Sequence, residues 1–159
     1  MVKILMVCMG NICRSPMAQA VLMHEAQALG WGGGIEVDSA GTHAHHKGEK
    51  PDPRGQAVAT KRGYAGMGQL RSRLIQAEDF ERFDLVVAMD RDNLAALQRL
   101  CPPQHAGKLK LLLADYAPQL GVDEVPDPYY GTASGFERVL DLCEAGVAGL
   151  LADLRRQTL

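Results

Sequence analysis

The residues best suited to do chemistry stand near the start of the chain, in the stretch VCMGNICRSP at residues 7–16. Cys8 follows a run of aliphatic residues, and Arg14 and Ser15 come shortly after it. An ionised cysteine is a strong nucleophile, and the planar guanidinium of an arginine can hold two phosphate oxygens. Two interpretations of Cys8 are open at this point: a small buried residue that ends a core strand, or a nucleophile that faces an anion.

The loop that follows Cys8 is suited to holding an anion. Gly10 and Asn11 are residue types that tolerate left-handed backbone angles, which let a loop turn several N–H groups inward. A helix that begins with Ser15 as its N-cap or with Pro16 would add free N–H groups and the positive end of its dipole. This environment favours the thiolate form of a cysteine. The order of these residues therefore favours a nucleophile and predicts phosphoryl transfer through a cysteinyl-phosphate; the GxxxxGK[ST] motif of ATP-binding loops is absent.

A candidate proton donor lies far along the chain, in the stretch PDPYYG at residues 126–131. Cleavage of a phosphate ester requires a proton for the leaving oxygen, and Asp127 stands between two prolines that restrict its backbone. Tyr129 and Tyr130 follow directly and could flank an aromatic leaving group. Asp-Pro alone is an ordinary turn signal, so the interpretation of Asp127 as a general acid depends on its combination with the first loop.

Alternating strand and helix patterns must position these segments. A nearly continuous apolar run predicts a strand at residues 2–7, and an alternating pattern predicts a second at 35–40. Two further strands are predicted at 83–90 and 108–113. Capping and periodicity predict helices from Ser15 or Pro16 to Gly30, near residues 54–62, from Asp90 or Asp92 to about Leu100, and after residue 131. This alternation is typical of a parallel sheet covered by helices on both faces, in a single three-layer α/β domain over residues 1–159. Ligands bind such sheets beyond the carboxyl ends of the strands, where Cys8 stands.

The helices should dock on the sheet through apolar stripes. In the first helix the spacing predicts a stripe through Met17, Ala20, Val21 and Ala28, with His24 on the same face. In the last helix, apolar residues recur at three- and four-residue steps from Phe136 to Leu154.

Composition excludes several classes of protein. The chain has 159 residues, 47% hydrophobic and 23% charged, with a net charge of −2 that gives no support for nucleic-acid binding. No apolar run approaches the roughly 20 residues of a membrane span, and we expect a cytoplasmic protein. The four cysteines lack zinc-site spacing and are too few for a disulfide scaffold. The HAHH run at residues 43–46 is weak evidence for a metal site, so we predict no metal and no cofactor.

Taken together, these segments resemble the low-molecular-weight protein tyrosine phosphatases, over essentially the whole chain. The stretch VCMGNICRSPMAQAV resembles the N-terminal signature of that family, DSAGT at 38–42 its second strand end, and DPYYG at 127–131 its acid loop. The resemblance implies a four-stranded parallel sheet and a mechanism without metal or cofactor.

The resemblance also implies roles for individual residues. Cys8 would attack phosphorus, and Asp127 would protonate the leaving phenolate and later act as a base toward water. Ser15 would stabilise the thiolate, and Asn11 would be bonded toward Ser39. The phosphate oxygens would be held by Arg14 and by the loop formed by Met9, Gly10, Asn11, Ile12, Cys13 and Ser15. The rim of the site would contain His45, Tyr129 and Tyr130, with Met9 facing them.

Two positions depart from the family pattern. Leu70 stands where members often carry a histidine that braces the loop asparagine, and His45 stands where many carry Trp or Tyr. Cys13 is, by family analogy, a partner for a reversible disulfide with Cys8 under peroxide, or else a small packed residue. We interpret Cys101 and Cys143 as structural.

Three other functions fit the same fold. Protein-arginine phosphatases typically carry Thr where this chain has Ile12, and Ile12 favours a flat phenol. Thioredoxin-linked arsenate reductases use two further cysteines near residues 79–92, a stretch without cysteine here. A non-catalytic phosphate-binding module would need neither Cys8 nor Asp127. We therefore expect phosphotyrosyl proteins as substrates, a bacterial tyrosine kinase as one candidate partner, and a monomer or weak self-association.

Overall fold

Four parallel strands form one sheet in the order β2-β1-β3-β4 in a computed structural model, which describes residues 1–158. The strands are β1 (Val2–Cys8), β2 (Ile35–Gly41), β3 (Leu85–Ala88) and β4 (Leu109–Leu111). β1 is an interior strand, and residues 4–7 within it are fully buried, as a continuous apolar run predicts. Cys8 is the last residue of β1 and pairs with Gly41 at the end of β2. The predicted four-stranded parallel α/β domain is confirmed.

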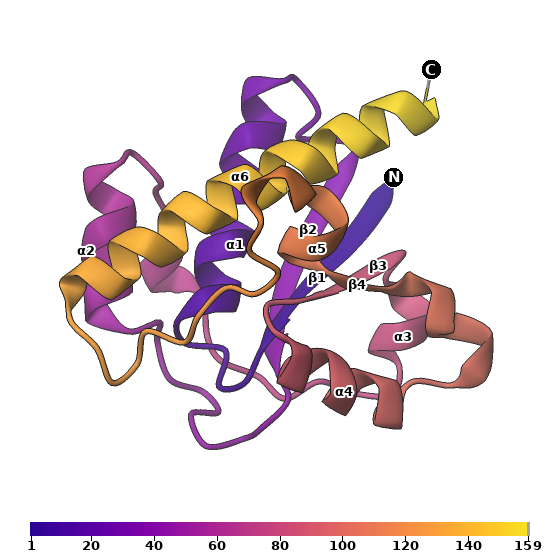
Figure 1. Cartoon of the computed structure of the whole chain (residues 1–159), viewed down its shortest axis with the longest axis horizontal. Helices are drawn as coiled ribbons and strands as arrows, with labels where there is room; N and C mark the ends of the chain where they lie inside the picture. Colours follow the sequence, from indigo (N-terminus) through magenta and orange to yellow (C-terminus); the bar gives the residue numbers. More distant parts are fainter. Residues whose placement is uncertain (159) are drawn as a thin grey trace.

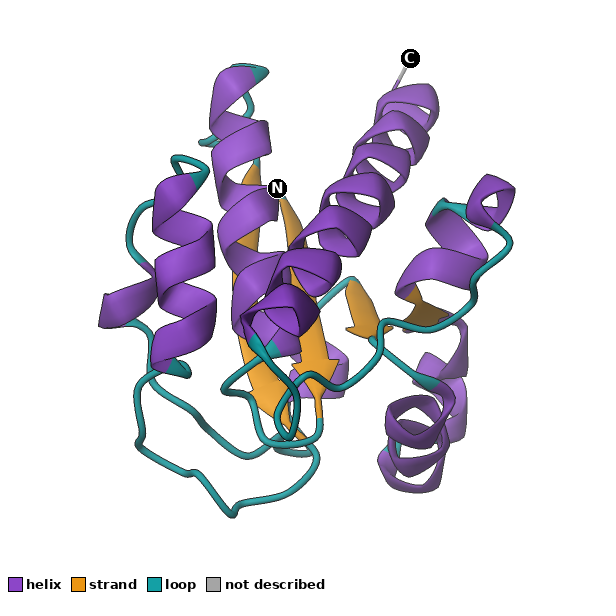
Figure 2. Ribbon diagram, turned by 60° about the vertical axis from the view of Figure 1, so that its left-hand side comes forward, coloured by secondary structure: helices purple, strands orange, loops and turns teal. Residues whose placement is uncertain are grey.

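Helices cover both faces of this sheet (Figures 1 and 2). One face carries α1 (Arg14–Ala28), α2 (Pro53–Lys61), α5 (Leu112–Tyr116) and the long helix α6 (Ala133–Thr158). The other carries α3 (Asp79–Arg82) and α4 (Arg91–Leu100). Short 3-10 segments occur at Met67–Gln69, Pro103–Lys108 and Pro118–Leu120. Alternate residues of β1 enter the two cores, with Ile4 and Met6 in one and Leu5 and Val7 in the other.

The start of α1 differs from the prediction, and the difference concerns the site. The helix begins at Arg14 with Cys13 at the N-cap position, so the predicted N-cap role of Ser15 is wrong. The Ser15 hydroxyl instead contacts the Cys8 sulfur. Gly30 follows the helix with a φ of 79°, which agrees with the predicted end.

The apolar stripe of α1 was also only partly predicted. Met17, Ala20 and Val21 are buried, but His24 and Ala28 are exposed, so the stripe does not continue to the end of the helix. The first turns, residues 14–22, are instead buried on all sides because α1 runs between the sheet and α6.

The remaining boundaries differ in two places. The predicted strand at 108–113 ends at Leu111, since Leu112 and Leu113 begin α5; the strand at 83–90 shortens to Leu85–Ala88. Asp90 caps α4 through a reciprocal bond with Asn93, which decides between the two predicted starts of that helix. No helix within residues 1–158 is long and apolar enough to span a membrane.

Candidate active site

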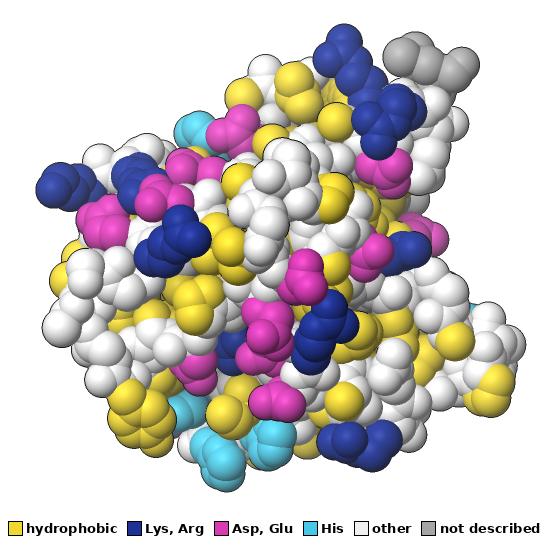
Figure 3. All heavy atoms as spheres, viewed as in Figure 1, with side chains coloured by type: hydrophobic (Ala, Val, Ile, Leu, Met, Phe, Trp, Pro, Cys, Tyr) yellow, Lys and Arg dark blue, Asp and Glu magenta, His cyan; other side chains and the backbone are white. Residues whose placement is uncertain are grey.

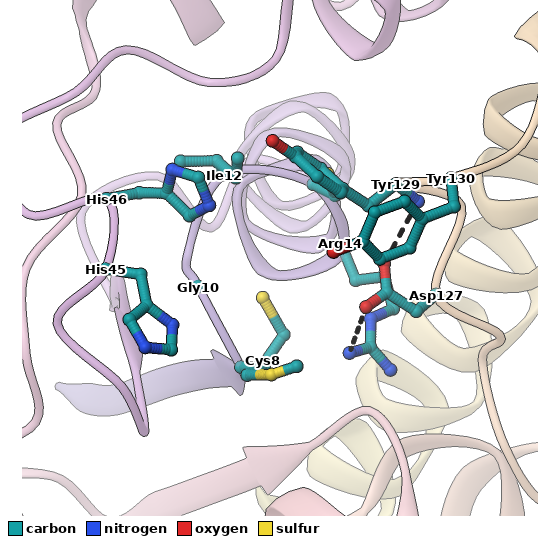
Figure 4. A pocket seen from close by; sticks show the side chains of 11 residues that line it. Cys8, Gly10, Ile12, Arg14, His45, His46, Asp127, Tyr129 and Tyr130 are labelled. Carbon is teal, nitrogen blue, oxygen red and sulfur yellow. Dashed lines mark hydrogen bonds and ion pairs between the residues drawn. The ribbon is translucent and has the colours of Figure 1, made fainter.

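A cavity of about 100 Å³ opens at the carboxyl end of β1 (Figure 4). Three segments line it: the phosphate loop (residues 8–15), the rim loop (residues 43–50) and the acid loop (residues 125–131). Backbone hydrogen bonds join the start of the rim loop to the phosphate loop, from Thr42 N, directly before the rim loop, to Cys8 O at 3.0 Å and from His43 N to Met9 O at 3.0 Å. Segments far apart in the sequence therefore meet around one small hollow.

Cys8 lies at the bottom of this cavity and is 2% exposed. Its Sγ is 3.0 Å from the Ser15 hydroxyl and 3.5 Å from the Ser15 backbone N–H, which donates to it. The sulfur therefore faces the N-terminus of α1, where N–H groups and the helix dipole favour negative charge.

Asn11 gives the phosphate loop its shape. It has a φ of 58°, in the left-handed region that asparagine tolerates, as expected from its type. Its Nδ2 donates to Ser15 Oγ at 2.8 Å and to Ser39 Oγ at 2.9 Å, and its Oδ1 accepts from Arg73 N at 3.0 Å. Because Ser15 Oγ accepts from this amide, the hydroxyl proton of Ser15 is free to point at Cys8 Sγ.

Arg14 is 2% exposed, and its guanidinium is fixed by hydrogen bonds that Nη1 donates. Nη1 donates to Asp90 Oδ2 at 2.5 Å and to the carbonyl of Val125 at 3.0 Å, and Nη2 lies 3.7 Å from Asp127 Oδ2. Nε is buried without a hydrogen-bond partner among residues 1–158. Burial opposes the charge of Arg14, but Cys8 and Asp90 outweigh it and the pKa of Arg14 is raised. A charged fork thus has its Nε–H edge unpaired beside the cavity.

Asp127 lies across the cavity from Cys8 (Figure 4) and is 39% exposed. Its Oδ1 accepts from Tyr129 N at 3.1 Å, which fixes the carboxylate against its own loop. The ring of Tyr129 packs edge-on to that of Tyr130, with centroids 4.9 Å apart, and lies 5.6 Å from that of His46. Tyr130 is 95% exposed, so it forms the outer rim.

Comparison with known proteins agrees with this geometry. Residues 3–159 match the family model of low molecular weight phosphotyrosine protein phosphatases. A low molecular weight protein-tyrosine-phosphatase of Streptomyces coelicolor is 46% identical, over 98% of this chain and 94% of that protein. The human low molecular weight phosphotyrosine protein phosphatase is 40% identical, over 89% of this chain and 88% of that protein.

This chain belongs to that family. The fold leads to the same family, since a crystal structure of a protein tyrosine phosphatase from Entamoeba histolytica superposes with a TM-score of 0.94. It is 38% identical and covers all of both chains.

The structure of this phosphatase-family chain brings most of the predicted residues together. Cys8, Met9, Gly10, Ile12, Cys13, Arg14, His45, Asp127, Tyr129 and Tyr130 line the cavity. Three predicted residues do not line the cavity and are joined by hydrogen bonds beside it: Asn11 and Ser15 of the phosphate loop, and Ser39. The roles assigned to these residues remain predictions.

Sequence reasoning missed four residues that touch this assembly: His46, Ser72, Arg73 and Asp90. His46 lies over the phosphate loop, and a Cβ at Gly10 would be 2.9 Å from its Cδ2. Asp90 lies two residues after the end of β3, and the rule that ligands bind at carboxyl strand ends was a usable signal for it. On the face seen in Figure 3, histidine side chains gather over the rim loop beside acidic side chains.

Leu70 stands where family members often carry a bracing histidine, and two residues close to it in sequence, Ser72 and Arg73, bond to the phosphate loop instead. Ser72 Oγ donates to Gly10 O at 2.8 Å, and Arg73 N donates to Asn11 Oδ1. Arg73 is fixed in turn by ion pairs of its guanidinium with Asp38 and Asp79, at 3.1 and 2.9 Å. The phosphate loop of this chain is therefore braced by a serine and a backbone amide.

The other cysteines differ from Cys8 in environment. Cys13 is 4% exposed, and burial, followed by the charge of Cys8, raises the pKa of Cys13 to about 12. Cys143 is fully buried in the core and burial raises its pKa to about 12. Cys101 is half-buried. Disulfide pairing of Cys8 with Cys13 remains a prediction, since both thiols are free in this structure.

Proposed function

We propose that this chain hydrolyses phosphotyrosyl proteins and small aryl phosphates through a cysteinyl-phosphate intermediate. The observation that carries the proposal is the buried, unpaired Nε–H of Arg14, a residue that lines the same cavity as Cys8. Asp90 and Val125 occupy Nη1, which leaves Nε and the outer N–H of Nη2 to hold two phosphate oxygens. A buried arginine arranged in this way favours binding of a phosphate dianion.

The first chemical step transfers the phosphoryl group to sulfur. The Cys8 thiolate attacks phosphorus, the S–P bond forms, and the P–O bond to the phenol breaks with its electron pair going to oxygen. Asp127, on the opposite side of the cavity, gives its proton to that oxygen. Arg14 and the N–H groups of the phosphate loop stabilise the charge on the other oxygens.

The second step regenerates the enzyme. Asp127, now ionised, takes a proton from water, the water oxygen attacks phosphorus, and the S–P bond breaks. The thiolate leaves with its electron pair and accepts the Ser15 hydroxyl proton as a hydrogen bond. Inorganic phosphate is the product.

The walls of the cavity favour an aryl substrate. Ile12, 6% exposed, and the ring of Tyr129 line the cavity, so a flat phenol can pack between apolar surfaces. Phosphotyrosyl proteins are accordingly the substrates, with a bacterial tyrosine kinase as one candidate. Four free thiols suit a reducing compartment, which supports a cytoplasmic location. We expect a monomer or weak self-association.

The decisive experiment is hydrolysis of p-nitrophenyl phosphate from mildly acidic to neutral pH, with EDTA and no added metal. Wild type turns over; Cys8→Ser loses turnover but still binds phosphate; Asp127→Ala loses about 10²–10⁴-fold in rate. No turnover by clean, reduced wild type would contradict the proposal. Turnover by Cys8→Ser would remove the assigned nucleophile.

The choice between phosphotyrosine and phosphoarginine needs its own comparison. We expect wild type to prefer a phosphotyrosyl peptide over a phosphoarginyl one, and Ile12→Thr to shift the ratio toward phosphoarginine, because a hydroxyl suits a polar guanidinium. Faster phosphoarginine turnover by wild type would reverse the assignment.

A further inference from the structure

An acidic and a basic residue at the start of α2 lie between the phosphate loop and the acid loop. Asp52 is the N-cap of α2, and its Oδ1 accepts from Arg54 N at 2.9 Å. The backbone N–H of Asp52 donates to the carbonyl of Ile12 at 2.8 Å. The N-terminus of α2 is therefore fastened directly to the phosphate loop.

The guanidinium of Arg54 extends from this point to the acid loop. Nε donates to Asp52 Oδ1 at 3.0 Å, and Nη2 lies 2.8 Å from Asp52 Oδ2. Nη1 donates to the carbonyl of Gly131 at 3.1 Å, and Nη2 to that of Tyr129 at 2.8 Å. Its Cζ also lies over the ring of Phe136, 4.7 Å from the centroid. One planar group thus binds Asp52 along one edge and two acid-loop carbonyls with its remaining donors.

The acid loop has a second attachment at its beginning. Val125 N donates to Met89 O at 2.9 Å, and Val125 O accepts from Arg14 Nη1. Asp127 lies between this attachment and the one at Tyr129. The N–H of Tyr129 orients the Asp127 carboxylate, while the carbonyl of the same residue accepts from Arg54.

We propose that Arg54 is a positioning residue, which sets the place of the Asp127 carboxylate relative to the phosphate loop. Asp52 connects Arg54 to Ile12, and Arg54 connects Asp52 to Tyr129 and Gly131. Arg54 acts on the general acid and not on the bound phosphate. This inference rests on the proposed function, because it concerns the proton that Asp127 delivers.

The dependence of rate on the leaving group tests this role. A general acid matters most when the departing phenolate is basic, so loss of its alignment slows phenyl phosphate more than p-nitrophenyl phosphate. Arg54→Met should lower kcat/KM for phenyl phosphate about 10–100-fold, the cost of a small misplacement of a catalytic group. The loss for p-nitrophenyl phosphate should be smaller, and inhibition by inorganic phosphate should stay within about twofold, because the phosphate loop is intact.

A double-mutant comparison separates positioning of the acid from other effects. Asp127→Ala removes the acid, so adding Arg54→Met to it should lower kcat/KM for phenyl phosphate by no more than about twofold. Full additivity of the two changes would overturn the inference. An equal loss on both substrates in the single variant would overturn it as well.

Arg62 provides a matched control on the same helix. It stands at the other end of α2 and pairs with Glu137, Asp141 and Glu144 of α6, away from the loops of the site. Arg62→Met should therefore leave the ratio of the two kcat/KM values unchanged. A changed ratio in Arg62→Met would show that any loosening of α2 produces the effect, and would also overturn the inference.

Two further points keep the test decisive. If Arg54→Met does not show cooperative thermal unfolding, Arg54→Lys is measured instead, because lysine keeps the charge but cannot reproduce the fork. Failure of wild type to hydrolyse either ester counts against the proposed function. An active wild type with an unchanged ratio in the Arg54 variant counts against this inference alone.

Discussion

At the scale of single residues, the orientation of one hydroxyl sets the environment of Cys8, the proposed nucleophile. Asn11 Nδ2 can only donate, so Ser15 Oγ accepts from it and directs its own proton toward Cys8 Sγ, 3.0 Å away. The second N–H of Asn11 Nδ2 donates to Ser39 Oγ, which fixes the amide in this orientation. A chain of polar groups therefore stabilises negative charge on a sulfur that is nearly inaccessible to water.

Replacing Ser15 should affect the second chemical step most. In the second step the Cys8 thiolate is the leaving group, and in Ser15→Ala it no longer accepts a hydrogen bond from a hydroxyl. A hydrogen bond to a charged group is worth about 1.5–3 kcal/mol. We expect kcat to fall about 10–100-fold, with a smaller change in kcat/KM and a larger burst of p-nitrophenol in stopped flow. Equal losses in kcat and kcat/KM without a burst would contradict a role of Ser15 in the second step.

The environments of the cysteines predict a labelling pattern. Burial raises the pKa of Cys13 and of Cys143 to about 12, so both are almost entirely protonated at pH 8. Since the thiolate is the reactive form, iodoacetamide should label neither in the folded protein and both in urea. The measurement is peptide mass spectrometry of the Cys8→Ser variant at pH 8, in which labelling of Cys8 does not interfere with the comparison of Cys13 and Cys143. Rapid labelling of Cys13 in the folded variant would show that its thiol is not held in the protonated form.

At the scale of elements, the close approach of α5 to α6 depends on glycine. A Cβ at Gly149 would lie 1.6 Å from the carbonyl oxygen of Tyr116, and one at Gly146 would lie 2.5 Å from Leu112 Cγ. These contacts hold α5 directly after β4, although in KLKLLL the alternating residues 108–111 continue straight into two further leucines, with no glycine, proline or other turn residue between strand and helix. Apolarity alone does not mark where a buried strand becomes a buried helix, which is why the end of β4 was not predicted.

Alanine at Gly149 should be strongly unfavourable. Helix propensity alone favours alanine over glycine by about 1 kcal/mol, but the backbone contact with Tyr116 forces α5 away. We expect Gly149→Ala to lower the free energy of unfolding by about 2–3 kcal/mol or more, measured in urea.

A matched substitution lies near the start of the same helix. A Cβ at Gly135 meets its nearest atom, Pro128 Cβ, at 3.5 Å, which is ordinary contact. Gly135→Ala should stay within about 1 kcal/mol of wild type. Similar values for the two variants would contradict the argument from close approach.

At the scale of the whole molecule, the sequence was most informative where neighbours along the chain interact. The phosphate loop, Asp127, four parallel strands and the main helices follow from local patterns. The pairing of Arg14 with Asp90 and the reach of Arg54 to the acid loop depend on how the sheet brings remote segments together. The position of Asp90 after a strand marks it as a site candidate, but local composition does not show which residues pair, because each is an ordinary charged residue on its own.

The stability of the whole molecule should depend on the Asp52–Arg54 pair at acid pH. The side-chain bond from Arg54 lowers the pKa of Asp52, so this contribution is present above the unfolded-state pKa of about 3.9 and is lost as pH falls through the folded value. The difference in unfolding free energy between wild type and Arg54→Met should therefore shrink as pH falls below about 4. Urea titrations at several pH values measure it, and a difference independent of pH would contradict this account.

The interior position of β1 has a consequence for biosynthesis. β1, which leads to Cys8, is made before both of its neighbours in the sheet, and β3 is made only from residue 85 onward. Ser39 and residues 72–73, which shape the phosphate loop, also follow it. On the ribosome, the nascent chain therefore contains its reactive cysteine well before that cysteine has an anion site. We therefore expect phosphatase activity only after residues 125–131 have emerged and the acid loop has docked.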